Sequence, residues 1–213
     1  GVQVTPETCR ACSLFVNQDP HAGKRHVAVP GEGPAPSAIM IIGEAPGVDE
    51  ADSGRPLVGA SGKRFDMLVK QAGLSRADLF ITNLLKHRPP GNRPPQVKEI
   101  KACAGFLEAQ LAAVQPALVI TLGLKAARYF DKAIQLKKDH GIPRSFTAAG
   151  RPFRLIPMYH PAAALYDANL WAVEVSDWLR LKEELSGQLD RPLDIPANYA
   201  LATDSEAAAL GAT

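Results

Sequence analysis

Short apolar runs alternate with longer segments of helical periodicity along this chain. Four runs have the length of buried strands, at positions 38–42, 78–85, 117–122 and 153–158. Apolar residues recur at helical spacing over positions 63–72, 97–114, 124–130 and 169–185. Short strands that are apolar throughout are typical of parallel sheets with helices on both faces. The alternation therefore predicts an α/β domain with a mostly parallel sheet.

Two stretches lack this periodicity. Positions 132–151 are polar and contain glycine, so we expect a loop there. From position 186 the chain is composed largely of Pro, Asp, Ala and Gly without a period. We therefore expect one domain over residues 1–185, followed by a surface-lying or disordered tail over 186–213.

Composition narrows the class of protein only a little. The 24 Lys and Arg against 22 Asp and Glu leave a formal charge of +2, which neither requires nor excludes nucleic acid. No long apolar run or signal-like start is present, so we expect a soluble, cytoplasmic protein without a membrane segment. Three cysteines do not form a disulfide framework. Cys9 and Cys12 form C-x-x-C, and this spacing leaves structural zinc, an iron–sulfur cluster and reduced thiols all open.

The connection after the first strand carries the strongest candidate for a binding site. Positions 43–62 hold five glycines and two prolines, and Glu44 directly follows the strand. In open α/β sheets, ligands bind at the carboxyl ends of strands. The stretch contains neither a P-loop nor a dinucleotide-binding glycine pattern. The alternative is that this stretch has no binding role and only turns the chain between the strand and the helix.

The second and fourth strands also end in polar residues. Lys86, Arg88 and Arg93 lie in a proline-rich stretch after the second strand. Such a loop either contacts phosphates of a nucleic acid or is simply solvated, and composition does not separate the two. His160 follows the fourth strand, where a lone histidine is more often structural than functional.

Three motifs resemble those of family 4 uracil-DNA glycosylases. Positions 43–62 begin with G-E-A-P-G and end with G-R-P-L-V-G-A-S-G, where the family has G-x-P-F-V-G-x-A-G. Positions 82–93 read T-N-L-L-K-H-R-P-P-G-N-R, where the family has T-N-x-x-K-C-R-P-P-x-N-R. Positions 160–165 read H-P-A-A-A-L, like the family's H-P-A-A-x-L. The chain departs at Ala51, Leu57 and His87, which replace an acid, a phenylalanine and a cysteine of the family pattern.

The resemblance implies a three-layer α/β/α fold and hydrolysis of the N-glycosidic bond of deoxyuridine in DNA. It assigns catalysis to Glu44 and His160, with Asp49 and Glu50 as weaker candidates or solvated loop acids. His160 would donate a hydrogen bond to uracil O2, and Glu44 would act on water or on the cationic sugar. The uracil pocket would be formed by Gly43, Ala45, Leu57 and Asn83.

The resemblance also implies contacts with uracil-containing DNA, single- or double-stranded, by a monomer. Lys86, Arg88 and Arg93 would bind phosphates. Leu165, or less favourably Tyr166, would fill the space that the base leaves, although an inward-packed Leu165 is an equal alternative from sequence.

Family 4 enzymes hold a [4Fe–4S] cluster on four cysteines. The matching positions here are Cys9, Cys12, His87 and Cys103. Histidine replaces thiolate ligands in Rieske centres, so the resemblance implies a structural cluster, with zinc at the same ligands as the alternative. A related branch that becomes trapped on DNA has an inserted basic loop after this motif. No such insertion separates His87 from Cys103, so we expect ordinary turnover.

Two other functions remain open at this point. The departures at Ala51 and Leu57 favour a binding module that has lost catalysis, whereas the presence of Glu44, Asn83 and His160 favours an enzyme. A glycosylase with broader scope for deaminated bases is a further alternative.

Overall fold

A five-stranded sheet lies at the centre of the part of the chain that the structure describes. The structure is a computed structural model, and it describes residues 5–16, 25–148 and 150–186. The strands run in the order β2-β1-β3-β5-β4, all parallel except β4, which pairs antiparallel with β5. Their bounds are β1 Ile39–Gly43, β2 Leu79–Asn83, β3 Leu118–Leu122, β4 Arg144–Ala148 and β5 Arg151–Met158.

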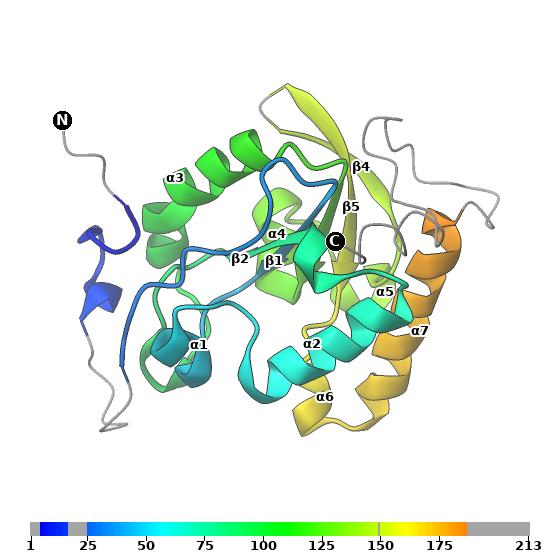
Figure 1. The fold of residues 1–213 in the computed structure, drawn as a ribbon, viewed down its shortest axis with the longest axis horizontal. Coiled ribbons are helices and arrows are strands. Elements are labelled where there is room, and N and C mark those ends of the chain that lie inside the picture. Colours follow the sequence, from blue (N-terminus) through cyan, green and yellow to red (C-terminus); the bar gives the residue numbers. More distant parts are fainter. Residues whose placement is uncertain (1–4, 17–24, 149, 187–213) are drawn as a thin grey trace, which may run out of the picture.

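Helices connect the parallel strands and cover both faces of the sheet (Figure 1). The α-helices are α1 Val48–Ser53, α2 Gly59–Gln71, α3 Val97–Val114, α4 Leu124–Phe130, α5 Leu136–Asp139, α6 Ala163–Tyr166 and α7 Asn169–Leu185. Short 3-10 turns lie at η1 Ser13–Phe15, η2 Arg76–Asp78 and η3 Pro90–Asn92. No helix within the described ranges has the length and apolar character needed to cross a membrane.

The alternation of side chains along β1 separates two apolar layers. Ile39 and Ile41 face one layer, in which α2 and α7 pack on the sheet. Met40 and Ile42 face the other, which contains residues of α3 and α4. All five residues of β1 are buried, as expected for a strand covered on both sides. The predicted three-layer α/β/α architecture is therefore confirmed.

Several boundaries differ from the sequence expectation. Residues 132–151 are not a loop, because they contain α5 and the edge strand β4. Burial along β4 alternates between half-buried and exposed, so this strand lacks the continuous apolar run that marks the inner strands. The stretch after β1 includes the short helix α1, and α2 begins at Gly59 instead of position 63. The expected tail over 186–213 lies outside the described residues except for position 186.

The four parallel strands bring their carboxyl ends to one edge of the sheet. Gly43 at the end of β1 pairs in register with Asn83 at the end of β2. Leu122 of β3 pairs with Met158 of β5. Residues that follow these positions therefore meet at a single edge, where ligands bind in folds of this class.

Candidate active site

A cavity of about 460 Å³ lies at this carboxyl edge. Its size is within the range of small-molecule sites in proteins. Residues from the connections after β1, β2 and β5 line it: Glu44, Ala45, Pro46, Gly47, Val48, Asp49, Glu50, Leu57, Val58, Ala60, Ser61, Asn83, Pro89, Asn92, Arg93, Pro94, Pro95, His160, Ala162, Leu165 and Tyr166. The structure thus gathers residues of all three sequence motifs around one space.

Gly43 is the point at which two of the predicted site residues meet. A Cβ added to Gly43 would come within 2.4 Å of Asn83 Oδ1 and 3.9 Å of His160 Nε2. The missing side chain therefore leaves room for the amide and the imidazole to approach the same region. The backbone of Gly43 does not have a positive φ, so its conformation alone does not require glycine. Glycine is required because the Asn83 side chain approaches its Cα closely.

The backbone fixes the tautomer of His160. Its Nδ1 accepts a hydrogen bond of 3.0 Å from the N–H of Ala162. A backbone N–H only donates, so Nδ1 carries no proton and the neutral ring has its proton on Nε2. Burial lowers the pKa of His160 to about 4. At neutral pH, His160 is therefore an uncharged donor whose Nε2–H lies on the side of Gly43.

Glu44 is held by the start of α4. Its Oε1 accepts a hydrogen bond of 3.0 Å from the N–H of Lys125. A Cβ at Gly123, where φ is +93°, would approach that oxygen within 2.5 Å, so glycine at this turn makes room for the carboxylate. Burial raises the pKa of Glu44, and the Lys125 N–H acts in the opposite direction. The Glu44 carboxylate, which follows β1, is thus also oriented by the connection after β3.

Glu50 has a structural contact that the sequence did not indicate. It is buried, and its two oxygens accept hydrogen bonds from the N–H groups of Gly47, at 3.1 Å, and Val58, at 3.2 Å. The interpretation of Glu50 as a solvated loop acid is therefore wrong. The side chain ties the beginning of the connection after β1 to its end. Asp49 lines the cavity, and Ala51 is buried in α1 outside the cavity lining.

The basic loop differs from its prediction. Lys86 is 0% exposed, and its Nζ donates to Thr82 Oγ1 at 2.6 Å, Asn83 O at 2.7 Å and Gln110 Oε1 at 2.8 Å. Arg88 is also buried, with its Nε donating to Asn92 Oδ1 at 2.6 Å. The expectation of a phosphate contact is wrong for Lys86, and Arg88 does not present the exposed side chain that such a contact requires.

Arg93, Leu165 and Tyr166 lie at the border of the cavity. The guanidinium of Arg93 pairs with both oxygens of the buried Glu99, at 3.0 and 2.5 Å, and is one-third exposed. Leu165 is 45% exposed and Tyr166 is 91% exposed. The inward-packed alternative for Leu165 is therefore wrong, and both side chains are available at the rim.

The four predicted cluster ligands are all at least half-buried. Cys12 packs with Leu14, Leu85 and Cys103 in a small apolar cluster. Burial raises the pKa of Cys103, and the nearby Cys12 and Cys9 thiols add to that effect. Burial lowers the pKa of His87, whose ring stacks on His26 with centroids 6.1 Å apart. Among the described residues, no three His, Cys, Asp or Glu side chains are arranged to hold a single metal ion.

Comparison with known proteins places this arrangement in a family. Residues 30–180 match the uracil DNA glycosylase superfamily. The chain belongs to this superfamily. A type-4 uracil-DNA glycosylase of Saccharolobus solfataricus is 42% identical over 186 residues, which cover 84% of this chain and 83% of that protein. Another, of Sulfurisphaera tokodaii, is 37% identical over 83% of this chain and 80% of that protein. A third, of Archaeoglobus fulgidus, is 36% identical over 83% and 87%.

Two contributors to this glycosylase-like site were not found from the sequence. The N–H of Lys125 binds Glu44, and Arg76 contacts the backbone of the cavity wall. The position of Gly123 at the end of the third strand does suggest from sequence that it borders the site, without a specific role, and in the structure it makes room for the Glu44 carboxylate. Arg76 lies between motifs in a polar stretch, where the sequence carries no signal of its contact.

Proposed function

We propose that this protein is a uracil-DNA glycosylase of base excision repair. It hydrolyses the N-glycosidic bond of deoxyuridine, releases uracil and leaves an abasic site. The observation that carries the proposal is the approach of Asn83 and His160 to the same space beside Gly43. We further propose that it acts as a monomer inside the cell, on single- or double-stranded DNA.

His160 and Asn83 recognise the base in this proposal. Cleavage leaves negative charge on the uracil, and a donor aimed at O2 stabilises that charge as it forms. A neutral His160 with its proton on Nε2 supplies such a donor. The amide of Asn83 offers both a donor and an acceptor, which match O4 and N3–H of uracil and mismatch cytosine. Asn83 is buried, so its discrimination operates away from water.

Glu44 serves the sugar side of the reaction. Breaking the glycosidic bond leaves an oxocarbenium-like sugar. A carboxylate either stabilises this cation or activates the water that attacks it. The hydrogen bond from Lys125 N–H orients the Glu44 carboxylate at the cavity wall. Ala45 and Leu57 provide apolar surface for the base.

The base must leave the duplex to enter the cavity. Leu165 and Tyr166 are exposed at its rim, so we propose that they fill or border the space left by the flipped nucleotide. Arg93 is the remaining basic-loop side chain with exposed surface at the cavity. We assign the phosphate contact to it alone.

The direct test is incubation of the purified protein with a uracil-containing oligonucleotide, followed by alkali to cleave abasic sites. Matched oligonucleotides with thymine, cytosine and hypoxanthine at the same position define the substrate range. We expect strand cleavage at uracil and none at thymine. Binding of uracil-DNA by well-folded protein without cleavage would favour a binding module, and cleavage at hypoxanthine would favour broader scope.

We also propose that Cys9, Cys12, His87 and Cys103 hold a [4Fe–4S] cluster with a structural role. Thiolates are the usual ligands of such clusters, and histidine ligates one iron of Rieske centres. Support comes from the burial of Cys9, His87 and Cys103 and from the proximity of the Cys9 and Cys12 thiols to Cys103. Such a cluster would connect the N-terminal segment to the loop after β2 and to α3.

Iron and sulfide analysis of protein purified without oxygen tests the cluster. We expect iron and sulfide in equal amounts and a brown chromophore that is lost in Cys103→Ser. Stoichiometric zinc without sulfide would contradict the cluster and support zinc at the same ligands. A matched His87→Cys variant should retain the chromophore.

A further inference from the structure

The backbone of Leu57 is held in a conformation that leucine rarely adopts. Its φ is +47°, in the left-handed region, and its side chain is 4% exposed in the cavity lining. Non-glycine residues persist in such conformations only where the surroundings enforce them, and these positions cluster at functional sites. The wall of the cavity is therefore a strained element that other residues must hold.

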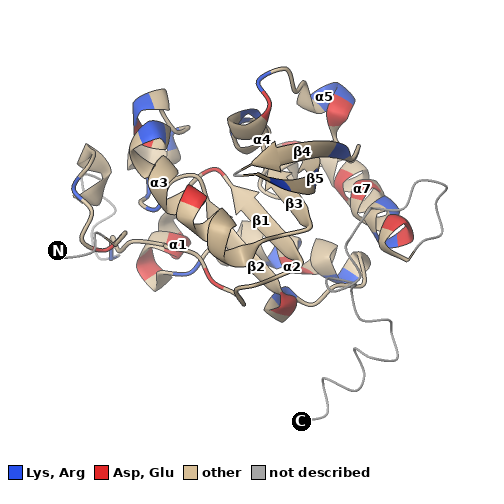
Figure 2. Cartoon of the chain, turned by 90° about the horizontal axis from the view of Figure 1, so that it is seen from above, with Lys and Arg blue, Asp and Glu red and all other residues tan. Residues whose placement is uncertain are grey.

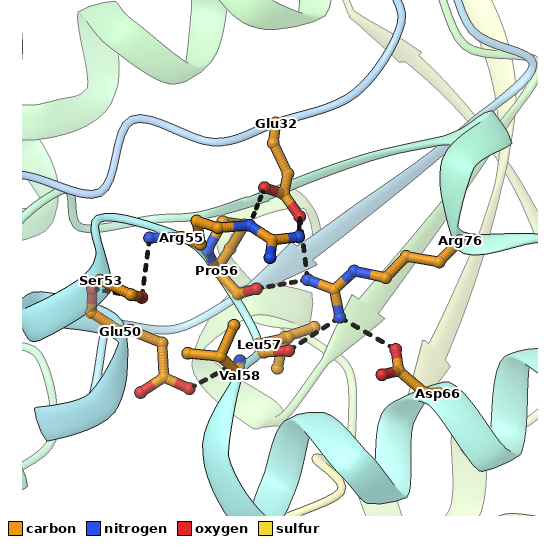
Figure 3. Close-up of polar contacts among 9 residues, drawn as sticks. All are labelled: Glu32, Glu50, Ser53, Arg55, Pro56, Leu57, Val58, Asp66 and Arg76. Carbon is orange, nitrogen blue, oxygen red and sulfur yellow. Dashed lines mark hydrogen bonds and ion pairs between the residues drawn. The ribbon is translucent and has the colours of Figure 1, made fainter.

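Contacts on both sides of Leu57 enforce this conformation (Figure 3). Arg76 Nη1 donates to the carbonyl of Leu57 at 2.8 Å, and Nη2 donates to the carbonyl of Pro56 at 2.5 Å. The N–H of Val58 donates to Glu50 at 3.2 Å. A Cβ at Gly62 would come within 2.2 Å of Leu57 O, so only glycine lets α2 approach this closely.

Arg76 is itself anchored by two carboxylates. Nη1 also pairs with Asp66 Oδ1 at 2.9 Å, and Nη2 also pairs with Glu32 Oε1 at 3.0 Å. Each terminal nitrogen thus serves one backbone carbonyl and one carboxylate. The planar guanidinium has the number and direction of donors for this pattern, whereas the single ammonium group of lysine does not.

We propose that Arg76 is a positioning residue for uracil cleavage, which acts by fixing the backbone of Leu57 at the wall of the base pocket. The inference rests on the proposed function. Arg76 does not line the cavity and belongs to none of the three sequence motifs. It reaches the base only through Leu57. Without its two donors, the strain at Leu57 relaxes and the apolar wall moves away from the base.

The test compares Arg76→Met with Asp66→Asn. The first variant removes the donors to both carbonyls. The second removes the charge of one anchor but keeps a side-chain oxygen that accepts from Nη1, so those donors stay in place. We expect Arg76→Met to lower kcat/KM on uracil-DNA by about 10- to 100-fold. This range corresponds to the strain energy of one residue held in a rarely populated backbone conformation. We expect it to weaken inhibition by free uracil to a similar degree, with affinity for uracil-free DNA unchanged. Asp66→Asn should keep the parent kcat/KM, even where its melting temperature falls.

A second background separates positioning from general stability. In Leu57→Gly the positive φ carries no strain and the side-chain wall is already absent. If Arg76 acts through Leu57, adding Arg76→Met to Leu57→Gly should change kcat/KM by less than about twofold. The effects of two substitutions that disturb the same contact do not add. Arg76→Lys, which keeps the charge, should show a loss in the same direction as Arg76→Met and serves where that variant does not fold.

Equal losses from Arg76→Met in the parent and in Leu57→Gly would overturn the inference, as would parent-like uracil inhibition in Arg76→Met or Arg76→Lys. Either result with an active parent leaves the proposed function intact. A parent that neither cleaves uracil-DNA nor binds uracil would overturn the proposed function and this inference with it.

Discussion

The connections after β1 and β2 border the same cavity but are held in different ways. We call residues 44–58 the Glu44 loop and residues 84–96 the Lys86 loop. Both contain prolines and charged residues, but the charges of the Glu44 loop are mostly acidic and those of the Lys86 loop are basic. In the Glu44 loop, Glu50 and Arg76 bind backbone groups and aim the loop at the cavity. In the Lys86 loop, the cations themselves are the internal braces, because Lys86 and Arg88 are buried.

The difference shows that the composition of a loop does not reveal whether its charged side chains are exposed. Lys86 and Arg88 lie in a proline-rich loop and are nevertheless buried. Lys86 donates to three acceptors, one of which is the backbone carbonyl of Asn83. Its ammonium therefore substitutes for regular structure at the end of β2, since buried polar groups need partners. By contrast, Lys137 and Lys138 of the short helix α5 are exposed, and Figure 2 shows basic and acidic residues side by side on this helix.

The comparison predicts that catalysis depends on the Glu44 side of the cavity together with His160. We expect His160→Ala to lower the single-turnover rate of uracil cleavage by about 100- to 1000-fold, as for the loss of one donor to a developing anion. DNA affinity, measured separately by anisotropy, should be unchanged. Asn83→Asp is the companion variant. It should reduce discrimination against cytosine, because a carboxylate only accepts hydrogen bonds. A parent rate in His160→Ala would show that the active site lies elsewhere.

The pH dependence of cleavage should report Glu44 and not His160. Burial raises the pKa of Glu44 above 4.5, whereas the pKa of His160 lies at about 4. As the pH falls, Glu44 therefore takes up a proton first, and the rate declines while His160 is still neutral. Glu44→Gln should be slower than the parent at neutral pH and should lose this acidic limb. An acidic limb of the same position in Glu44→Gln would contradict the assignment.

The Lys86 loop should respond to substitution by losing stability. Lys86→Met removes the donor from a buried site and leaves acceptors on Thr82, Asn83 and Gln110 with one partner fewer. We expect the free energy of unfolding to fall by roughly 1–3 kcal/mol, measured by urea denaturation. The salt dependence of DNA binding should not change. A flatter salt dependence without loss of stability would instead restore Lys86 to the interface.

Much of the fold followed from apolar periodicity, because the inner strands and long helices bury continuous or periodic apolar surface. The helices α3, α4 and α7 have the predicted bounds. The edge strand β4 was missed, since one half-exposed face leaves no apolar run to recognise. The positions of Glu44, Asn83 and His160 followed from strand ends and motifs. The groups that hold them did not, because Arg76 and the N–H of Lys125 act across long sequence separations that no local pattern encodes.

The smallest expected effect separates the arginines within the Lys86 loop. Arg93 is one-third exposed at the cavity although it pairs with Glu99, whereas Arg88 is buried. We expect Arg93→Gln to reduce the slope of log affinity against log salt by about 0.9, the contribution of one phosphate contact. Arg88→Gln should leave the slope unchanged.

Arg151, exposed at the start of β5 and thus at the opposite edge of the sheet, is the matched control for Arg→Gln substitution. The slope is measured by titrating labelled uracil-free duplex at several salt concentrations, so that cleavage does not interfere. An unchanged slope in Arg93→Gln would mean that its guanidinium stays on Glu99 when DNA binds. The Lys86 loop would then act only as a brace, and phosphate contacts would have to come from other elements.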